Sequence, residues 1–155
     1  MSLVVRPVTA QDEAKWRELW AGYLVFYEFS DIDPTITDRT WERLVGDQDD
    51  MFCFVAEFQG NVIGLANCVL HPNTWSKQKV CYLEDLFVDQ NVRSKGAGRA
   101  LIEKIVQHGK AENWYSLYWR TATGNATAQA LYEDVSNRLD RFTYEIKLGA
   151  VPDNA

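Results

Sequence analysis

The sequence has few of the residues on which metal sites and disulfide frameworks depend. Its 155 residues include three cysteines, Cys53, Cys68 and Cys81, and two histidines, His71 and His108. The cysteines are odd in number and form no CxxC pair, and neither histidine has a partner at a recognisable ligand spacing. A disulfide framework and a zinc site are therefore both poor interpretations, and we expect no metal. The pattern favours buried free thiols in strands, because free cysteine behaves as a small apolar residue.

Long apolar runs, internal repeats and low-complexity tracts are also absent from the sequence. No apolar run approaches the roughly 20 residues of a membrane span. The N-terminus lacks an apolar signal core, since Arg6 and Pro7 interrupt it early. We therefore expect a cytoplasmic protein with no membrane partner. Hydrophobic residues make up 46% and charged residues 25%, which excludes the disordered and fibrous classes and predicts one globular domain over residues 1–155.

The sequence has no excess of positive charge. The formal net charge is −6, which argues against a nucleic-acid partner. Residues 1–60 carry −7, from five bases against twelve acids, and the remainder carries +1. Two interpretations stay open: the carboxylates form a solvated face, or the acidic end receives a cation and the slightly basic end an anion.

The spacing of apolar residues predicts an alternation of strands and helices. An antiparallel meander followed by a strand–helix–strand unit predicts the α+β class, with a mixed, mostly antiparallel central sheet flanked by helices. We expect strands at 3–8, 51–58, 62–70, 79–88, 115–121 and 142–148, and helices from Thr9 to about Tyr27, at 37–45, at 98–113 and at 126–137.

Residues 88–101, VDQNVRSKGAGRAL, place basic residues and glycines between a strand and an amphipathic helix. Glycine lets backbone N–H groups approach a ligand, and a helix N-terminus attracts an anion. The bases fit a polyphosphate better than a lone carboxylate. A P-loop is excluded because no Gly-Lys-Ser/Thr follows, and the dinucleotide fingerprint fails at Leu101, where its third glycine should be. A loop with basic residues for solubility is the alternative.

A second motif lies on the last expected helix. Asn125 and Tyr132 are seven residues apart and therefore share one helix face. The combination of Arg93-x-x-Gly96-x-Gly98 with Asn125-x-x-Ala128-x-x-Leu131-Tyr132 closely resembles the GNAT family of N-acetyltransferases, in which the first motif is the acetyl-CoA pyrophosphate signature. Tyr27-Glu28 and the strand YLEDLFV at 82–88 are similar to the spermidine/spermine and yeast histone- and polyamine-type branch. One departure is VSNR at 135–138, where most of the family has a Gly-Phe turn.

The resemblance implies an α/β/α layered, GNAT-like fold and direct transfer of an acetyl group from acetyl-CoA to a primary amine. The −7 charge of residues 1–60 and the positions of Glu28, Glu84 and Asp85 favour a cationic small-molecule acceptor, such as a polyamine or diamine. The open sheet edge left by the expected strand at 142–148, together with the resemblance, favours a homodimer paired near the C-terminal strands. Two alternatives stay open. The acceptor could be a lysine or N-terminus of a protein, or the chain could be a catalytically silent acyl-CoA-binding module.

The resemblance also implies roles for individual residues. Glu84 is expected as the base for the amine, and Tyr132 as the acid for the CoA thiolate. The acceptor is expected to contact Tyr27, Glu28, Glu84 and Asp85. The residues expected to bind the cofactor are Leu86, Phe87, Val88, Arg93, Ser94, Lys95, Gly96, Ala97, Gly98, Arg99, Ala100 and Asn125.

Taken alone, several of these residues admit a purely structural role. Asn125 equally fits a helix N-cap, and Tyr132 fits a core tyrosine. Glu84 and Asp85 are neighbours and cannot both face one pocket in a regular strand, so their roles require a bulge. Tyrosine is a weaker acid than a thiol by ~1.5 pKa units, so proton donation requires either concerted transfer or a lowered tyrosine pKa.

Overall fold

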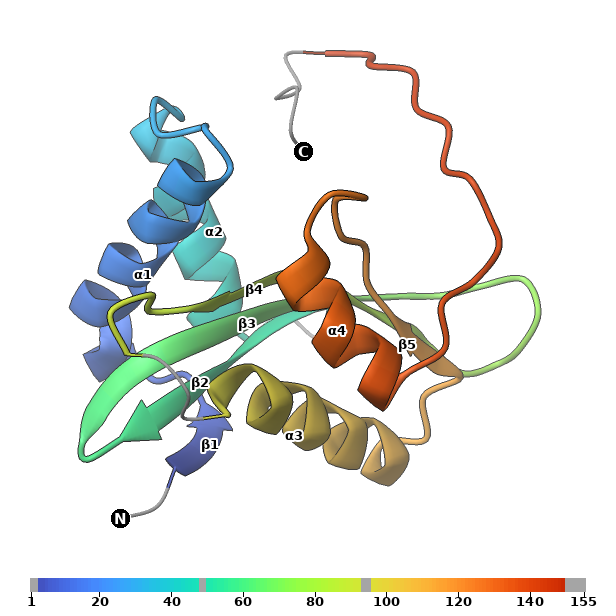
Figure 1. The fold of residues 1–155 in the computed structure, drawn as a ribbon, viewed down its shortest axis with the longest axis horizontal. Coiled ribbons are helices and arrows are strands. Elements are labelled where there is room, and N and C mark those ends of the chain that lie inside the picture. The colour runs from blue at the N-terminus through green and yellow to red at the C-terminus, as the bar shows by residue number, and fades with distance from the viewer. Residues whose placement is uncertain (1–2, 48–49, 93–95, 150–155) are drawn as a thin grey trace.

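The computed structural model describes residues 3–47, 50–92 and 96–149, and its elements follow the expected alternation (Figure 1). Four strands form an antiparallel meander, and the fifth runs parallel to the fourth, in the order β1-β2-β3-β4-β5. This confirms the mixed, mostly antiparallel sheet. The strands are β1 (Leu3–Pro7), β2 (Met51–Phe58), β3 (Asn61–His71), β4 (Val80–Val88) and β5 (Ser116–Tyr118). The helices are η1 (Ala10–Asp12), α1 (Glu13–Phe26), α2 (Pro34–Val45), α3 (Ala97–Ala111) and α4 (Ala126–Val135).

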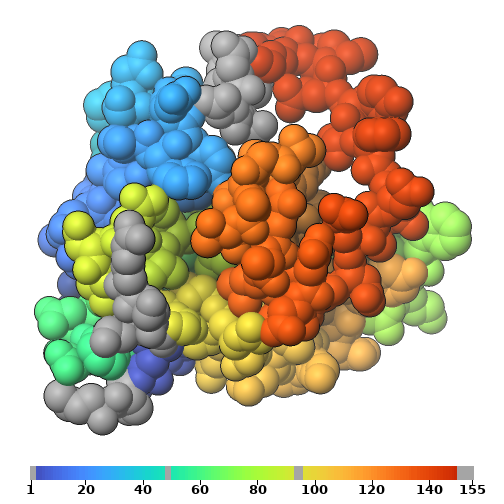
Figure 2. All heavy atoms as spheres, viewed as in Figure 1, coloured from blue at the N-terminus to red at the C-terminus, as the bar shows by residue number. Residues whose placement is uncertain are grey.

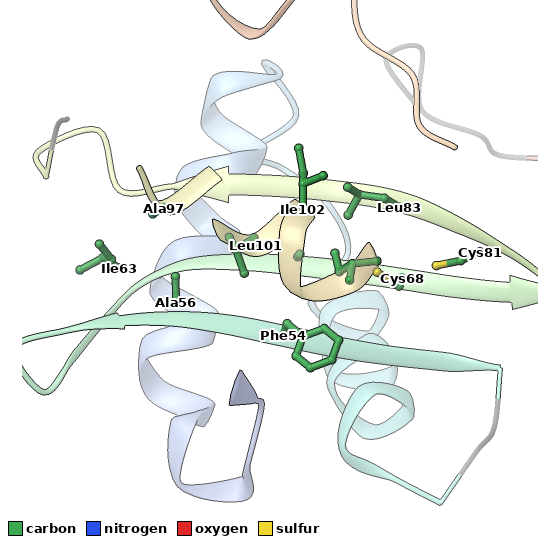
Figure 3. Close-up of a cluster of buried hydrophobic side chains, with 11 residues drawn as sticks. Phe54, Ala56, Ile63, Cys68, Cys81, Leu83, Ala97, Leu101 and Ile102 are labelled. Atoms are coloured by element: carbon green, nitrogen blue, oxygen red, sulfur yellow. The ribbon is translucent and has the colours of Figure 1, made fainter. Parts of the chain in front are cut away.

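Helices cover both faces of the sheet, so the fold is layered as expected. On one face, α1 and α2 bury three tryptophans, Trp16, Trp20 and Trp41, against β2 and β3. On the other face, α3 buries Leu101, Ile102 and other side chains against β2, β3 and β4 (Figure 3). Side chains of α4 pack against the edge of this second cluster. Cys53, Cys68 and Cys81 are free and buried in β2, β3 and β4, which confirms the expected thiols.

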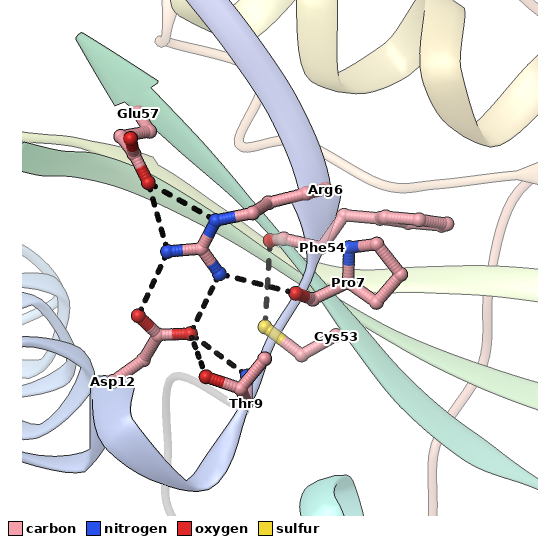
Figure 4. Close-up of polar contacts among 7 residues, drawn as sticks. All are labelled: Arg6, Pro7, Thr9, Asp12, Cys53, Phe54 and Glu57. Carbon is pink, nitrogen blue, oxygen red and sulfur yellow. Dashed lines mark hydrogen bonds and ion pairs between the residues drawn. The ribbon is translucent and has the colours of Figure 1, made fainter. Parts of the chain in front are cut away.

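An ion-pair cluster fixes the start of α1 relative to the sheet (Figure 4). The Arg6 guanidinium on β1 donates to Asp12 Oδ2 at 2.8 Å and to Glu57 Oε2 on β2 at 2.9 Å. The Thr9 backbone N–H also donates to Asp12 Oδ2, at 2.8 Å. Hydrogen bonding to Arg6 lowers the pKa of the buried Asp12 carboxyl. The cluster thereby positions the helix that carries Tyr23 and Tyr27.

Most predicted elements differ from the observed ones by a few residues, and for α2 and β5 the reason is visible. Helix α2 begins three residues earlier than expected, because Asp33 acts as its N-cap and Pro34 occupies its first turn. The Asp33 Oδ1 accepts the Thr35 backbone N–H at 2.9 Å. Strand β5 spans Ser116–Tyr118, whereas a strand over 115–121 was expected. Its pairing with β4 ends at Tyr82 and Tyr118, so the two strands separate beyond that point.

The expected strand at 142–148 is wrong for the single chain. Residues 137–149 contain no strand and extend away from the body of the molecule (Figures 1 and 2). Within the expected strand at 142–148, four apolar residues are between 85% and 93% exposed, namely Phe142, Tyr144, Ile146 and Leu148. A strand requires a hydrogen-bonded neighbouring strand, and in the described part of this chain no strand pairs with the segment. In the described ranges, no helix is long and apolar enough to cross a membrane.

Candidate active site

A β-bulge in β4 sorts the side chains of the site between the two faces of the sheet. Asp85 is opposite Asn67 on β3 and Leu83 is opposite Cys68, so Glu84 has no partner. The extra residue changes the alternation. Leu83 and Leu86 both pack on the α3 side, whereas Asp85 hydrogen-bonds on the α1 side. The bulge expected from the neighbouring carboxylates is therefore present.

A pocket lies where β4 separates from β5. Helix α1, the bulged part of β4, the residues that follow β5, and α4 all contribute to it. Its lining consists of Tyr23, Tyr27, Leu83, Glu84, Leu86, Trp119, Arg120 and Tyr132. The pocket therefore brings together aromatic side chains, one carboxylate and one guanidinium.

The pocket contains some of the residues expected in the site and not others. Tyr27, Glu84, Leu86 and Tyr132 line it. Asp85 does not line it and is directed toward α1. Glu28 is exposed just beyond the end of α1, with a left-handed φ of 57°, and is also not part of the lining.

Sequence reasoning did not identify four other residues that line the pocket, namely Tyr23, Leu83, Trp119 and Arg120. Tyr23 lies one helical turn before Tyr27, so the expected role of Tyr27 could have indicated it. Trp119 and Arg120 belong to no motif. They follow β5, and their contribution depends on the separation of β5 from β4.

Half-buried Asp85 belongs to a polar chain behind the pocket, in which Asn67 and Trp16 are buried. The Asn67 amide Nδ2 donates to Asp85 Oδ2 at 3.1 Å, and the Trp16 indole donates to Asn67 Oδ1 at 3.3 Å. The Tyr23 hydroxyl also hydrogen-bonds to the carboxyl. Burial, together with the neighbouring Glu84, raises the pKa of Asp85 to about 7, although the hydrogen bonds oppose this.

Glu84 and Tyr132 are both partly desolvated in the pocket. Burial raises the pKa of the Glu84 carboxyl, and the nearby Arg120 opposes this. Burial also raises the pKa of the Tyr132 phenol, whose ring contacts Trp119 edge to face with the centroids 5.4 Å apart. The phenol is therefore a neutral hydrogen-bond donor. A lowered tyrosine pKa, one of the two routes expected for proton donation, is not observed.

The start of α3 provides backbone N–H groups near α4. Gly96 precedes the helix with φ of 71°, a left-handed conformation that favours glycine. The first turn of α3 contains no acidic side chain. A Cβ atom at Gly98 would lie 3.5 Å from Leu131 Cδ2, so this turn lies against α4. Arg93, Ser94 and Lys95 fall outside the described residues.

Two of the residues expected to bind the cofactor have structural partners. Asn125 is the N-cap of α4, since its Oδ1 accepts the Ala128 backbone N–H at 3.3 Å. The cap interpretation is therefore confirmed. Arg99 donates to Asp134 Oδ2 at 2.6 Å, an exposed ion pair that links α3 to α4. Such a surface pair is weak and can exchange for another anion.

Comparisons with known proteins identify relatives over nearly the whole chain. Residues 14–136 match the family model described as the acetyltransferase (GNAT) family. The D-amino-acid N-acetyltransferase HPA3 of Saccharomyces cerevisiae is 30% identical over 145 residues, which cover 92% of this chain and 89% of that protein. N-acetyltransferase 8 of Homo sapiens is 29% identical over 84 residues, 54% of this chain and 37% of that protein.

Solved structures share the fold at low sequence identity. The aminoglycoside acetyltransferase HMB0005, from an uncultured soil sample, superposes with a TM-score of 0.79 at 23% identity and covers 96% of this chain and 100% of its own. The aminoglycoside N-acetyltransferase AAC(6')-Iy in complex with CoA has a TM-score of 0.79 at 18% identity, covering 95% of each chain. These likenesses confirm the α+β GNAT-like fold.

The raised pKa of Asp85 predicts a specific dependence of stability on pH. The folded-state pKa of about 7 lies above the ordinary value of 3.8, so the folded protein binds this proton more tightly than the unfolded chain does. The contribution is therefore fully present below pH 4 and is lost as the pH rises through 7. Between pH 4 and 8, wild type should lose up to about 4 kcal/mol of unfolding free energy relative to Asp85→Asn, which cannot ionise.

Urea unfolding at a series of pH values measures this difference. Asp31→Asn is the matched control, because Asp31 is exposed, and its profile should follow that of wild type. Parallel profiles for wild type and Asp85→Asn would show that the buried carboxyl does not retain its proton.

Proposed function

The chain belongs to the GNAT acetyltransferase family and is an acetyl-CoA-dependent N-acetyltransferase; on that premise, we propose that it acetylates a primary amine of a small molecule bound in the pocket. The observation that carries this proposal is the meeting of Glu84 and Tyr132 in one pocket, although they belong to β4 and α4. A base and an acid on opposite elements are what direct acetyl transfer requires. The partial desolvation of both groups supports their use in proton transfer.

In this proposal, the start of α3 binds the CoA pyrophosphate. The N-terminal N–H groups of a helix without acidic side chains in its first turn attract an anion. The bases Arg93 and Lys95 and the hydroxyl of Ser94 would complete this loop, with Gly96, Ala97, Gly98, Arg99 and Ala100 contributing mainly backbone. Asn125 would act through its backbone, since its side chain caps α4.

The separation of β4 from β5 supports an oxyanion site. Among the described residues, none pairs with β4 on its β5 side beyond Tyr82. Backbone N–H groups near Leu86, Phe87 and Val88 would then contact the acetyl and pantetheine groups and stabilise the developing negative charge. The Phe87 ring packs in the α1 core, with its centre 6.2 Å from the centre of the Tyr23 ring. Phe87 would therefore contact the cofactor through its backbone.

Glu84 is proposed to accept the proton that the amine must lose. An alkyl ammonium has an ordinary pKa of ~10.4, so forming the free amine at neutral pH costs roughly 4 kcal/mol. A carboxylate in the pocket can receive that proton directly or through water. A pKa raised by burial makes Glu84 a better proton acceptor than an exposed glutamate.

Tyr132 is proposed to donate a proton to the departing CoA thiolate. Because its pKa is raised, donation must be concerted with the development of charge on sulfur. The neutral phenol is suited to this role, since it remains a hydrogen-bond donor at every physiological pH. Trp119 keeps the ring in place by its edge-to-face contact.

The residues that line the pocket limit the class of amine that can serve as the acceptor. The acidic residues of the sequence favour a polyamine or diamine as the acceptor. Of the three carboxylates expected to contact it, Glu28, Glu84 and Asp85, only Glu84 lines the pocket. The yeast relative is named for D-amino acids, and structural neighbours are named for aminoglycosides. A small primary amine is common to all of these.

Substitution of Tyr132 tests whether this residue is the general acid that protonates the CoA thiolate. Tyr132→Phe keeps the ring and removes the hydroxyl, so kcat should fall by about 10²-fold, because a thiolate is already a fair leaving group. Calorimetry should show unchanged acetyl-CoA affinity. Tyr115→Phe, at an exposed tyrosine outside the pocket, should retain wild-type kcat. Wild-type turnover in Tyr132→Phe, where chemistry limits the rate, would mean that the ring serves packing alone.

Substitution of Glu84 tests whether this residue is the general base, and the readout is the pH dependence of kcat/KM. In wild type, kcat/KM should be lost as the pH falls through the raised pKa of Glu84, because the base must be ionised. Glu84→Gln should lower kcat/KM at pH 7 by about 10²- to 10³-fold and shift the profile toward the pKa of the free amine. Glu103→Gln, at an exposed position on α3, is the control and should follow wild type. A Glu84→Gln profile equal to that of wild type would assign the proton to another acceptor.

We further propose that the segment 142–148 forms its strand with a second copy of the chain, giving the homodimer expected from the sequence. The segment alternates apolar and polar residues, and its apolar side chains are almost fully exposed in the single chain. Strand β5 is an edge of the sheet. Open edges and exposed apolar stretches are normally paired or covered.

Light scattering at tens of micromolar tests the dimer. Wild type should have the mass of two chains, and Ile146→Asp should shift the protein to one chain, because a carboxylate would enter the apolar face of the paired strand. Thr143→Asp lies on the polar side of the same alternation and should remain dimeric. A monomeric wild type, or a dimer unaffected by Ile146→Asp, would exclude this pairing.

A further inference from the structure

The pocket contains opposite charges that do not neutralise each other. Glu84 and Arg120 both line it, yet no ion pair within 4.0 Å joins them in the described part of the chain. They are close enough for Arg120 to oppose the rise of the Glu84 pKa. We propose that this pair recognises a zwitterionic acceptor, an amino acid whose ammonium binds at Glu84 and whose carboxylate binds at Arg120. The inference rests on the proposed function and specifies its acceptor.

Aromatic stacking prepares Arg120 for this role. Its guanidinium lies over the Tyr82 ring, 5.3 Å from the ring centre. Tyr82 in turn stacks on Tyr118 with the centroids 4.9 Å apart and the planes 14° apart. The Tyr118 hydroxyl and His71 Nε2 are 3.1 Å apart, which links the stack to β3. Stacking restricts the guanidinium plane and leaves its N–H donors available for a carboxylate.

The position of Arg120 also disfavours the alternative acceptors. A diamine would bring a second positive charge toward the guanidinium, and the pocket offers one carboxylate to balance it. A neutral amine would leave the guanidinium without an anion. An amino acid satisfies both charges and gains a charge-assisted hydrogen bond at each end. The remaining lining, from Tyr23, Tyr27, Trp119 and two leucines, suits an apolar side chain on that acceptor.

Steady-state kinetics with a matched series of acceptors tests the inference. The series is phenylalanine in each enantiomer, phenylalaninamide, phenethylamine and 1,4-diaminobutane, with the release of free CoA as the readout. At least one enantiomer of phenylalanine should have a higher kcat/KM than the amide, the amine and the diamine. In Arg120→Gln, its KM should rise about 10- to 100-fold with little change in kcat, whereas KM for phenethylamine should change less than twofold.

Two further variants separate recognition from a structural role. Arg120→Lys keeps the positive charge but cannot form a bidentate pair with a carboxylate. It should therefore recover part of the affinity for the amino acid that Arg120→Gln loses. Arg138→Gln removes an exposed arginine outside the pocket and should leave every KM unchanged. An equal rise in KM for all acceptors in Arg120→Gln would overturn the inference, because it would indicate a general loss of pocket structure.

The outcomes also distinguish this inference from the proposed function. Preferential turnover of the amide, phenethylamine or the diamine would overturn the zwitterionic acceptor and leave the acetyltransferase proposal intact. Turnover of none of these amines would overturn the small-amine proposal and this inference with it. Wild-type KM for phenylalanine in Arg120→Gln would likewise exclude Arg120 as the carboxylate-binding residue.

Discussion

A single unpaired residue in β4 determines where the polar side chains of the site lie. Because Glu84 has no partner on β3, Leu83 and Leu86 face the α3 core while Asp85 meets Tyr23 and Asn67 on the α1 side. In an unbroken strand Leu83 and Asp85 would share a face, which would bury a carboxyl in the apolar core or expel a leucine from it. The bulge avoids both conflicts, and it brings Glu84 to the pocket just beyond the last β4–β5 pair.

The charges around the bulge differ in their access to water, and this difference sets the charge of the pocket. Asp85 lies half-buried behind it in a chain of hydrogen bonds, whereas Glu84 and Arg120 line it and are both exposed. Two adjacent carboxyls, one of them desolvated, do not both ionise fully at neutral pH. The charges that face a ligand are therefore the negative charge of Glu84 and the positive charge of Arg120. The acidic character of residues 1–60 does not extend into the pocket.

Much of the architecture and part of the site could be predicted from the sequence. Apolar periodicity located the meander, the helices and the buried cysteines, and the adjacency of Glu84 and Asp85 required the bulge. Arg120 and Trp119 could not be predicted, because their place in the pocket depends on where β5 leaves β4 and no local pattern encodes that point. The segment 142–148 has the alternating pattern of a strand, but no strand forms there in the single chain. A strand forms only beside a neighbouring strand, and the alternation of residues does not reveal whether such a neighbour is present.

The buried cysteines bear on the redox chemistry of an enzyme that liberates a thiol at each turnover. Cys53, Cys68 and Cys81 are the three cysteines of the sequence, and each is at most 2% exposed. Burial raises the pKa of the Cys53 and Cys68 thiols, which suppresses the thiolate, the form that attacks disulfides. The folded protein consequently offers no accessible thiol to oxidised coenzyme. Acetyl transfer can proceed as reduced CoA accumulates or oxidises, without mixed disulfides forming on the protein.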